Sequence, residues 1–306
     1  MIMKTYQGTV KAVPLSVWQH QASAPCSDSR LPGWLNDLPV CKLSVNKQIP
    51  AMDIADTGKH GKCVDAQARS HLKRWHKTFL SLLTQPNQNL KLSKSSRPTY
   101  GLSLAPSATS GCGDLCPMAG NCSHVCLATA GNGRYNGVTV ARIAKTRCFA
   151  EHPELFIWAV GRELLKHKKK QNIACRLNVI SDLNWTRKTR WLFEDALPDI
   201  QFYDYTKVAK YLYQDRPKNY HITLSRQEGR DDECIKALED GHNVAVVFDT
   251  KPSQTLPSTW HGFPVIDGDL NDERWRDAPG HVVGLRAKGS ARGDQSGFVV
   301  SSATHS

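Results

Sequence analysis

The chain has 306 residues, a formal net charge of +12 and hydrophobic residues at 40% of its positions. This length and composition allow one large α/β domain, alone or with an appendage, and they exclude a disordered chain. No stretch approaches the roughly 18 consecutive apolar residues of a membrane-spanning helix. The first ten residues also lack the apolar core of a signal peptide. We therefore expect a cytoplasmic protein with no membrane partner.

The first part of the chain, residues 1–98, shows no sustained period and is rich in Pro, Ser and Asn. Residues 71–83 are the exception, because their apolar side chains fall on one stripe of a helix whose other face is basic. We predict that residues 1–98 form an irregular N-terminal extension that packs on the main domain. Residues 99–306 are predicted to form that domain.

Short apolar segments alternate with helical ones from Thr99 onward. This alternation predicts a parallel sheet with right-handed crossovers. The fold class is therefore α/β, a partial or complete (β/α) barrel of parallel strands, with a doubly wound open sheet as the alternative. Strands are predicted at residues 99–104, 175–180, 201–205, 220–224, 244–248, 263–266 and 282–285. Helices are predicted from about residue 138, after Pro153, and at residues 188–196, 207–213 and 231–240.

Four of the ten cysteines lie close together, directly after the first predicted strand: Cys112, Cys116, Cys122 and Cys126. In the cytoplasm cysteines stay reduced, and thiolates grouped on one loop are typical of metal ligands. Their spacing does not match the paired C-x2-C pattern of zinc sites. Three thiolates on a loop after the first strand indicate an iron–sulfur cluster, with zinc, or no metal, as the alternatives.

Polar side chains follow almost every predicted strand. The carboxyl ends of parallel strands form the site in α/β folds, so these residues are site candidates. We predict catalytic roles for Asp182, Asp204, Ser225, Arg226 and Asp249. Cofactor-binding roles are predicted for Ser181, Asp182, Ser225, Arg226 and Asp267. Helix capping is the alternative for about half of the Asp and Ser residues.

The chain carries 40 Lys and Arg against 28 Asp and Glu. A cytoplasmic protein this basic commonly binds a polyanion, and nucleic acid is the expected partner. A merely solvated basic surface is the alternative.

Several strings resemble the Gene product 88 family of phages and plasmids. They include L-S-L-A-P-S-A-T-S-G, C-P-M-A-G-N-C-S-H-V-C-L-A-T-A-G-N-G-R and V-V-G-L-R-A-K-G-S-A-R, and the resemblance runs from about Leu102 to Val300. It implies a protein of a mobile genetic element. It also implies that the cysteines of the family are Cys116, Cys122 and Cys126, which leaves Cys112 as a candidate fourth ligand.

The predicted architecture is more distantly similar to that of radical S-adenosylmethionine enzymes, which hold three cluster cysteines on the loop after the first barrel strand. Their C-x3-C-x2-C spacing is replaced here by Cys116-x5-Cys122-x3-Cys126, and Ser181-Asp182 stands where they carry Gly-Gly-Glu. This likeness implies a [4Fe–4S] cluster with one open iron, and S-adenosylmethionine as cofactor.

The favoured function is thus a radical S-adenosylmethionine-like enzyme of a mobile element that acts on nucleic acid or a nucleotide. One alternative is a non-catalytic nucleic-acid-binding maintenance or anti-defence factor, stabilised by a cluster or zinc. The other is a metal-dependent nuclease that uses the carboxylates of Asp182, Asp249, Asp267 and Asp269.

Overall fold

The computed structural model describes residues 41, 43, 48–49, 51–56, 58–75, 81–89, 91–169 and 171–304. Residues 1–40 of the predicted N-terminal extension and residues 76–80 of the predicted helix at residues 71–83 lie outside this described part. Within it, no helix is both long enough and apolar enough to cross a membrane.

In the described part of the chain, nine strands form one sheet, and most neighbouring strands are parallel. Their order across the sheet is β1-β2-β3-β4-β5-β6-β9-β8-β7. Only the edge pairs β1–β2 and β7–β8 are antiparallel. The prediction of an α/β fold with parallel strands is confirmed at this level. The edge strands β1 and β7 do not pair with each other, so the described strands leave the sheet open. The strands are β1 (Leu83–Thr84), β2 (Thr99–Leu102), β3 (Ala174–Arg176), β4 (Gln201–Thr206), β5 (Tyr220–Ser225), β6 (Val244–Phe248), β7 (Thr259–Trp260), β8 (Phe263–Asp267) and β9 (Val282–Arg286).

The last strands do not follow chain order, because β9 inserts between β6 and β8. Val282 of β9 is in register with Val244 of β6 on one side and with Val265 of β8 on the other. The buried Val282 and Val283 suit an interior strand, which is covered on both faces. The strand β8 is only half-buried and contains Pro264, which suits a place near the edge.

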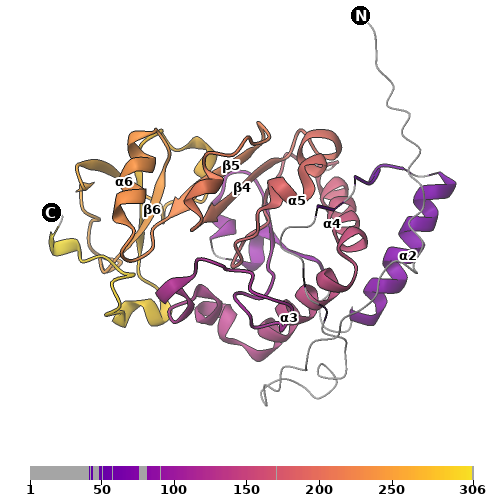
Figure 1. Cartoon of the computed structure of the whole chain (residues 1–306), viewed down its shortest axis with the longest axis horizontal. Coiled ribbons are helices and arrows are strands. Elements are labelled where there is room, and N and C mark those ends of the chain that lie inside the picture. Colours follow the sequence, from indigo (N-terminus) through magenta and orange to yellow (C-terminus); the bar gives the residue numbers. More distant parts are fainter. Residues whose placement is uncertain are drawn as a thin grey trace, which may run out of the picture.

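The main helices are α2 (Lys59–Trp75), α3 (Asn136–Glu151), α4 (Pro153–Lys168), α5 (Trp185–Trp191) and α6 (Asp231–Glu239). Among the main helices, α2 precedes the first strand and the others lie between strands in sequence. Pro153 begins α4, as predicted, since a first-turn proline loses no intrahelical hydrogen bond. The helix α4 contacts α2 on one side and α3 on another, and α2 forms an outer layer there (Figure 1).

Two predicted helices differ from the structure. The segment at residues 207–213 forms only the 3-10 turn Ala209–Tyr211, because so short a segment gains few intrahelical hydrogen bonds. The helix predicted at residues 71–83 begins earlier, at Lys59. Its last predicted residue, Leu83, instead pairs with Leu102 in the sheet.

The two faces of the sheet carry different side chains. One face is apolar: Cys175, Phe202 and Ile222 join the main hydrophobic core, and the ring of Phe193 packs edge-on against Phe202. In β3 to β5 the residues between these point to the other face, because side chains alternate along a strand, and several of them are polar. The polar residues are Arg176, Tyr203, Tyr205, His221 and Thr223.

The described residues before Thr99 pack on the rest of the chain. The strand β1 extends the sheet beside β2, and α2 lies against α3 and α4. Whether residues 1–98 and 99–306 form separate units stays a prediction.

Candidate functional site

The cysteine loop follows β2 and is anchored on the segment after β3. The backbone N–H of Leu115 donates to the carbonyl of Ser107, and the Leu115 carbonyl accepts a hydrogen bond from the Asp182 N–H at 2.7 Å. These bonds fix Cys116 beside Asp182, and the carboxylate of Asp182 raises the pKa of the Cys116 thiol. The loop therefore lies at the carboxyl ends of the central parallel strands.

Three thiols on this loop converge. Burial is the main cause that raises the pKa of Cys116, to about 12, and of Cys122; the nearby thiol of Cys126 raises both further. Backbone N–H groups aim at two of the three sulfurs. The N–H of Ser107 donates to Cys116 Sγ at 3.3 Å and the N–H of Ala128 to Cys126 Sγ at 3.4 Å. Such bonds stabilise thiolates and tune iron–sulfur clusters.

Cys112 lies apart from these three cysteines. Its side chain is fully buried and its sulfur contacts the carbonyl of Ser110 at 4.0 Å. Burial raises its pKa to about 11, against the lowering effects of Ser110 and Arg147. The loop thus offers three grouped thiols, and the fourth cysteine packs in the hydrophobic core.

Asp182 is a buried carboxylate at the centre of this rim. Its Oδ2 accepts the backbone N–H of Lys207 at 2.8 Å. Its Oδ1 is buried and has no hydrogen-bond partner among the described residues. Burial raises the pKa of Asp182 to about 6, against the hydrogen bonds from Lys207 and Thr206. Asp182 Oδ1 could therefore accept a hydrogen bond from a ligand.

Lys207 is the site residue that the sequence-based prediction missed. Its ammonium donates to Ser225 Oγ at 3.1 Å and to the carbonyl of Arg226 at 2.8 Å. Burial lowers its pKa, while Cys122, Asp182 and Glu228 raise it. Lys207 directly follows β4, whereas Asp182 comes six residues after the end of β3. The polar strand-end pattern was the only signal of Lys207 in the sequence.

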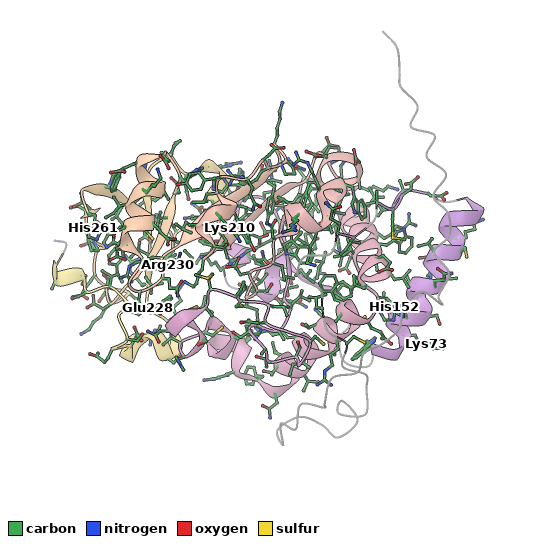
Figure 2. The ribbon with its side chains drawn as sticks, in the orientation of Figure 1. Lys73, His152, Lys210, Glu228, Arg230 and His261 are labelled. Atoms are coloured by element: carbon green, nitrogen blue, oxygen red, sulfur yellow. The ribbon has the colours of Figure 1, made fainter. Side chains whose placement is uncertain are left out.

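Two side chains after β5 complete the rim. The backbone N–H of Asn121 donates to Glu228 Oε1 at 2.8 Å. In the described residues, Gln227 Oε1 and Glu228 Oε2 are buried without a hydrogen-bond partner. Gly120 has a φ of +51°, and a Cβ there would lie 2.5 Å from atoms of both side chains, so glycine is required. Figure 2 shows Glu228 and Arg230 together at this rim.

Two other predicted site residues, Ser181 and Asp204, form hydrogen bonds within the protein core. Ser181 Oγ donates to Asn178 Oδ1 at 3.0 Å. The carboxylate of Asp204 accepts from the Asn178 N–H at 2.6 Å and from the Tyr220 hydroxyl at 2.7 Å. Burial raises the pKa of Asp204 to about 7. Both oxygens of Asp204 are thus used within the core, close to Asp182.

The other predicted site residues stabilise the rim or lie away from it. Ser225 accepts from Lys207, and Arg226 forms an ion pair with Asp231 at 2.6 Å. Asp249 accepts hydrogen bonds from the N–H and hydroxyl of Ser302. Asp267 pairs with Arg286 at 2.9 Å. The structure therefore places Asp182 near the thiols and Ser225 on Lys207. It ties Arg226, Asp249 and Asp267 to other partners.

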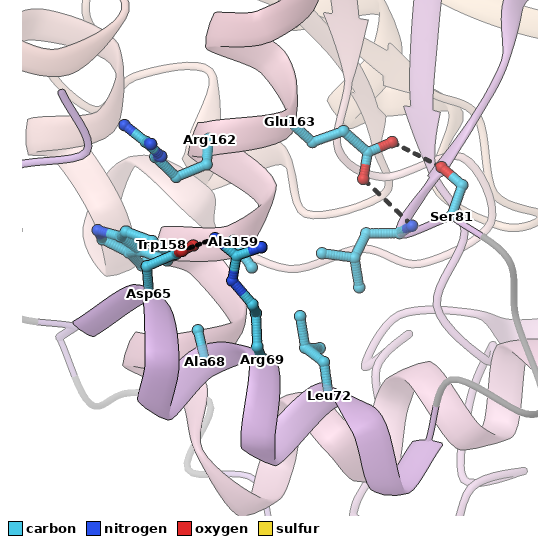
Figure 3. Close-up of a pocket in the computed structure, with 10 residues that line it drawn as sticks. Asp65, Ala68, Arg69, Leu72, Ser81, Trp158, Ala159, Arg162 and Glu163 are labelled. Atoms are coloured by element: carbon cyan, nitrogen blue, oxygen red, sulfur yellow. Dashed lines mark hydrogen bonds and ion pairs between the residues drawn. The ribbon is translucent and has the colours of Figure 1, made fainter. Parts of the chain in front are cut away.

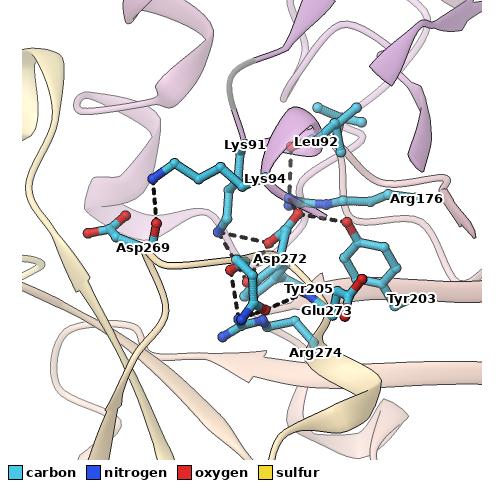
Figure 4. Close-up of polar contacts among 12 residues, drawn as sticks. Lys91, Leu92, Lys94, Arg176, Tyr203, Tyr205, Asp269, Asp272, Glu273 and Arg274 are labelled. Carbon is cyan, nitrogen blue, oxygen red and sulfur yellow. Dashed lines mark hydrogen bonds and ion pairs between the residues drawn. The ribbon is translucent and has the colours of Figure 1, made fainter. Parts of the chain in front are cut away.

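A second polar cluster fills the other face of the sheet. Lys91, Arg176, Tyr203 and Tyr205 converge on Asp272, which is fully buried (Figure 4). The Asp272 carboxylate accepts from the Tyr203 hydroxyl at 2.7 Å and the Tyr205 hydroxyl at 3.1 Å. It also lies 3.2 Å from Lys91 Nζ and 3.5 Å from the Arg176 guanidinium. These contacts occupy the polar face below the rim and hold residues 271–277 against the strands.

A cavity of about 230 Å³ is remote from the thiols. It lies between α2 and α4 and is lined by Ala68, Leu72 and Trp158 (Figure 3). Its carboxylate Glu163 already accepts from the Ser81 hydroxyl at 2.6 Å and the Leu82 N–H at 3.3 Å. Because its polar groups bind one another, we place the functional site at the rim, where buried acceptors face the thiols.

Comparison with known proteins identifies one family. No curated protein and no solved structure matches the chain significantly. The sequence model of the Gene product 88 family matches residues 80–302, which include β1 to β9 and the cysteine loop. The chain therefore belongs to the Gene product 88 family.

Proposed function

We propose that this protein holds a [4Fe–4S] cluster on Cys116, Cys122 and Cys126 and uses it in a radical S-adenosylmethionine-like reaction. The observation that carries the proposal is the grouping of three thiols at the carboxyl ends of parallel strands, while Cys112 packs elsewhere. Three ligands leave one iron of a cubane open to a further ligand.

The donor set fits a cluster better than zinc. A tetrahedral zinc site with Zn–S bonds of 2.3 Å would hold its sulfurs about 4 Å apart. Among the described residues, these three sulfurs do not all lie within 4.8 Å of one another. A cubane spreads its cysteines more widely, because each binds a different iron. The N–H groups aimed at Cys116 and Cys126 add support.

The residues around the thiols fit a small zwitterionic ligand. When bound, a reduced cluster with an open iron supplies the electron for reductive cleavage of S-adenosylmethionine. Asp182 Oδ1 and Glu228 Oε2 offer buried acceptors to an ammonium or hydroxyl group. Lys207 supplies positive charge between them.

The sheet topology is compatible with a partial barrel. The strands β2 to β6 follow one another in chain order, which places successive right-handed crossovers on the same face. The apolar face does carry the helices, and the polar face forms the interior cluster around Asp272. We infer a partial (β/α) barrel from this arrangement.

The test is cofactor turnover by the anaerobically reconstituted chain. With S-adenosylmethionine and dithionite, we expect release of deoxyadenosine, measured by mass spectrometry. The variant Asp182→Asn should keep its iron and melting temperature, yet bind S-adenosylmethionine at least about tenfold more weakly, since it loses one charged acceptor. Absence of both binding and deoxyadenosine in a chain that holds its cluster would refute the enzymatic part of the proposal.

We also propose that the substrate or partner is nucleic acid. The support is the net charge of +12 and the exposed Lys73, Lys166 and Lys169. Affinity for a labelled RNA or DNA oligonucleotide should fall steeply between about 50 and 200 mM salt, because phosphate contacts release counterions. A gel-shift or anisotropy titration without binding even at low salt would contradict this partner.

The geometry gives less support to a nuclease. Two divalent ions would need several carboxylates in one place. Asp249 is instead bound to Ser302, and Asp267 and Asp269 face Arg286.

A further inference from the structure

A second cluster of possible ligands lies far from the cysteine loop in the sequence, where α2 meets the junction of α3 and α4. It consists of His71, Glu151 and His152, whose ligand atoms all lie within 4.8 Å of one another. In the described part of the chain, no other group of three His, Cys, Asp or Glu is as close. His71 and Glu151 are buried, and His152 is half-buried. Figure 2 shows His152 beside the end of α2 that carries Lys73.

The hydrogen bonds of His71 define which ring nitrogen faces the carboxylate. Its Nε2 lies 3.0 Å from the carbonyl oxygen of Cys148. A carbonyl only accepts, so Nε2 carries the hydrogen. The other nitrogen, Nδ1, lies 3.6 Å from Glu151 Oε2. In the neutral form of the ring, this nitrogen presents its lone pair on the side of the carboxylate, as a metal ligand would.

The surroundings resemble the outer shell of a metal site. Metal-bound histidines usually donate their second N–H to a carbonyl or carboxylate, and ligating carboxylates are themselves hydrogen-bonded. Here His71 donates to the Cys148 carbonyl, and the indole N–H of Trp75 donates to Glu151 Oε2 at 3.2 Å. The rings of His71 and His152 lie edge to face, with centroids 4.6 Å apart. Both imidazoles and the carboxylate thus meet at one point.

We infer that His71, Glu151 and His152 bind a divalent transition metal ion, zinc in the first instance. Two imidazoles and one carboxylate are a donor set that zinc takes, with water as a fourth ligand. The ion would join α2 to the start of α4, and so tie the segment before the sheet to the helices that cover it. This site shares no residue with the cysteine loop, so it stands whether or not the cluster proposal does.

The test uses the full chain, purified without a polyhistidine tag, and cobalt(II) as a spectroscopic probe. Cobalt held by nitrogen and oxygen gives weak visible bands, whereas thiolate ligands add strong charge-transfer bands. We expect bands without thiolate character that persist in Cys116→Ala and disappear in His71→Asn. The control His261→Gln replaces a part-exposed histidine elsewhere and should leave them unchanged.

A second variant keeps the test valid if His71→Asn fails to fold. Glu151→Gln retains an oxygen to accept from Trp75, and it should weaken zinc binding by more than about 100-fold, beyond the effect of an outer-shell change. Zinc in 100-fold excess over its Kd should also raise the wild-type melting temperature by roughly 5 °C. Cobalt bands that vanish in Cys116→Ala but survive in His71→Asn would overturn the inference. A wild-type melting temperature that changes with neither zinc nor a chelator would overturn it too. The cluster would then be an imidazolium–carboxylate pair.

Discussion

Replacement of Cys116 by alanine should remove the iron from the protein, whereas the same replacement of Cys112 should leave it in place. Cys116 belongs to the three grouped thiols, and its loss leaves two ligands, too few to hold a cubane. Cys112 lies in the core beside Ser110 and Cys41, away from the other sulfurs. We expect iron to fall from about four atoms per chain to near zero in Cys116→Ala and to stay near four in Cys112→Ala.

Alanine is the better replacement at both positions, because a serine hydroxyl could still bind iron. The loss of the buried Cys112 sulfur leaves a small cavity and should cost about 1 kcal/mol of unfolding free energy. Iron analysis after anaerobic reconstitution, together with a thermal melt, separates the two effects. Equal iron loss in both variants would mean that all four cysteines ligate and that no iron is open.

The largest loss of stability is expected for Asp272→Asn. Asp272 is fully buried and faces Lys91 and Arg176, with Arg274 close by. Removal of its charge would leave these cations buried with too little compensation, which typically costs about 3–5 kcal/mol. Denaturant unfolding would measure the difference. The exposed ion-pair residue Asp199 gives a matched control, since Asp199→Asn should cost less than about 1 kcal/mol.

The Asp272 carboxylate should also make the stability of the protein depend on pH. Burial raises the pKa of Asp272, but Lys91, Arg176 and the Tyr203 hydroxyl outweigh it and hold the pKa below its usual range. A group whose pKa is lowered by folding stabilises the protein above its unfolded pKa, near 4. That contribution is lost as the pH falls further. Wild-type protein should therefore lose stability below about pH 4 more steeply than Asp272→Asn does. Parallel acid profiles for the two proteins would contradict the ion-pair role.

Most strands could be predicted from the sequence, because a strand is marked by the pattern of its own apolar residues. Val244–Phe248 was predicted with its observed bounds, since five consecutive apolar residues suit a buried parallel strand. The strand order at the far edge was not readable. The position of β9 between β6 and β8 depends on pairings between distant segments, such as Val244 with Val282. The short edge strands β1 and β7, of two residues each, were missed for want of any periodicity.

The sequence predicted where the candidate site would lie, but not which side chains the structure brings together there. The rule that parallel strands end at the site placed Asp182 and the thiols on the same rim. The same rule could not distinguish a carboxylate with an orphaned oxygen, Asp182, from one fully used by neighbours, Asp204. That difference depends on Asn178 and Tyr220, which come from other segments of the chain. Lys207 belongs to the polar strand ends in the sequence, but only its contacts in three dimensions distinguish it from the other residues there.

The most direct test of the central claim is the metal content and spectrum of wild-type protein purified without oxygen. The account predicts a brown protein with about four irons and four sulfides per chain, and a paramagnetic signal of a [4Fe–4S]⁺ cluster after reduction with dithionite. S-adenosylmethionine should change that signal, because it would bind the open iron beside Asp182. A colourless protein that carries zinc on the cysteine loop, with no iron after reconstitution, would contradict the account.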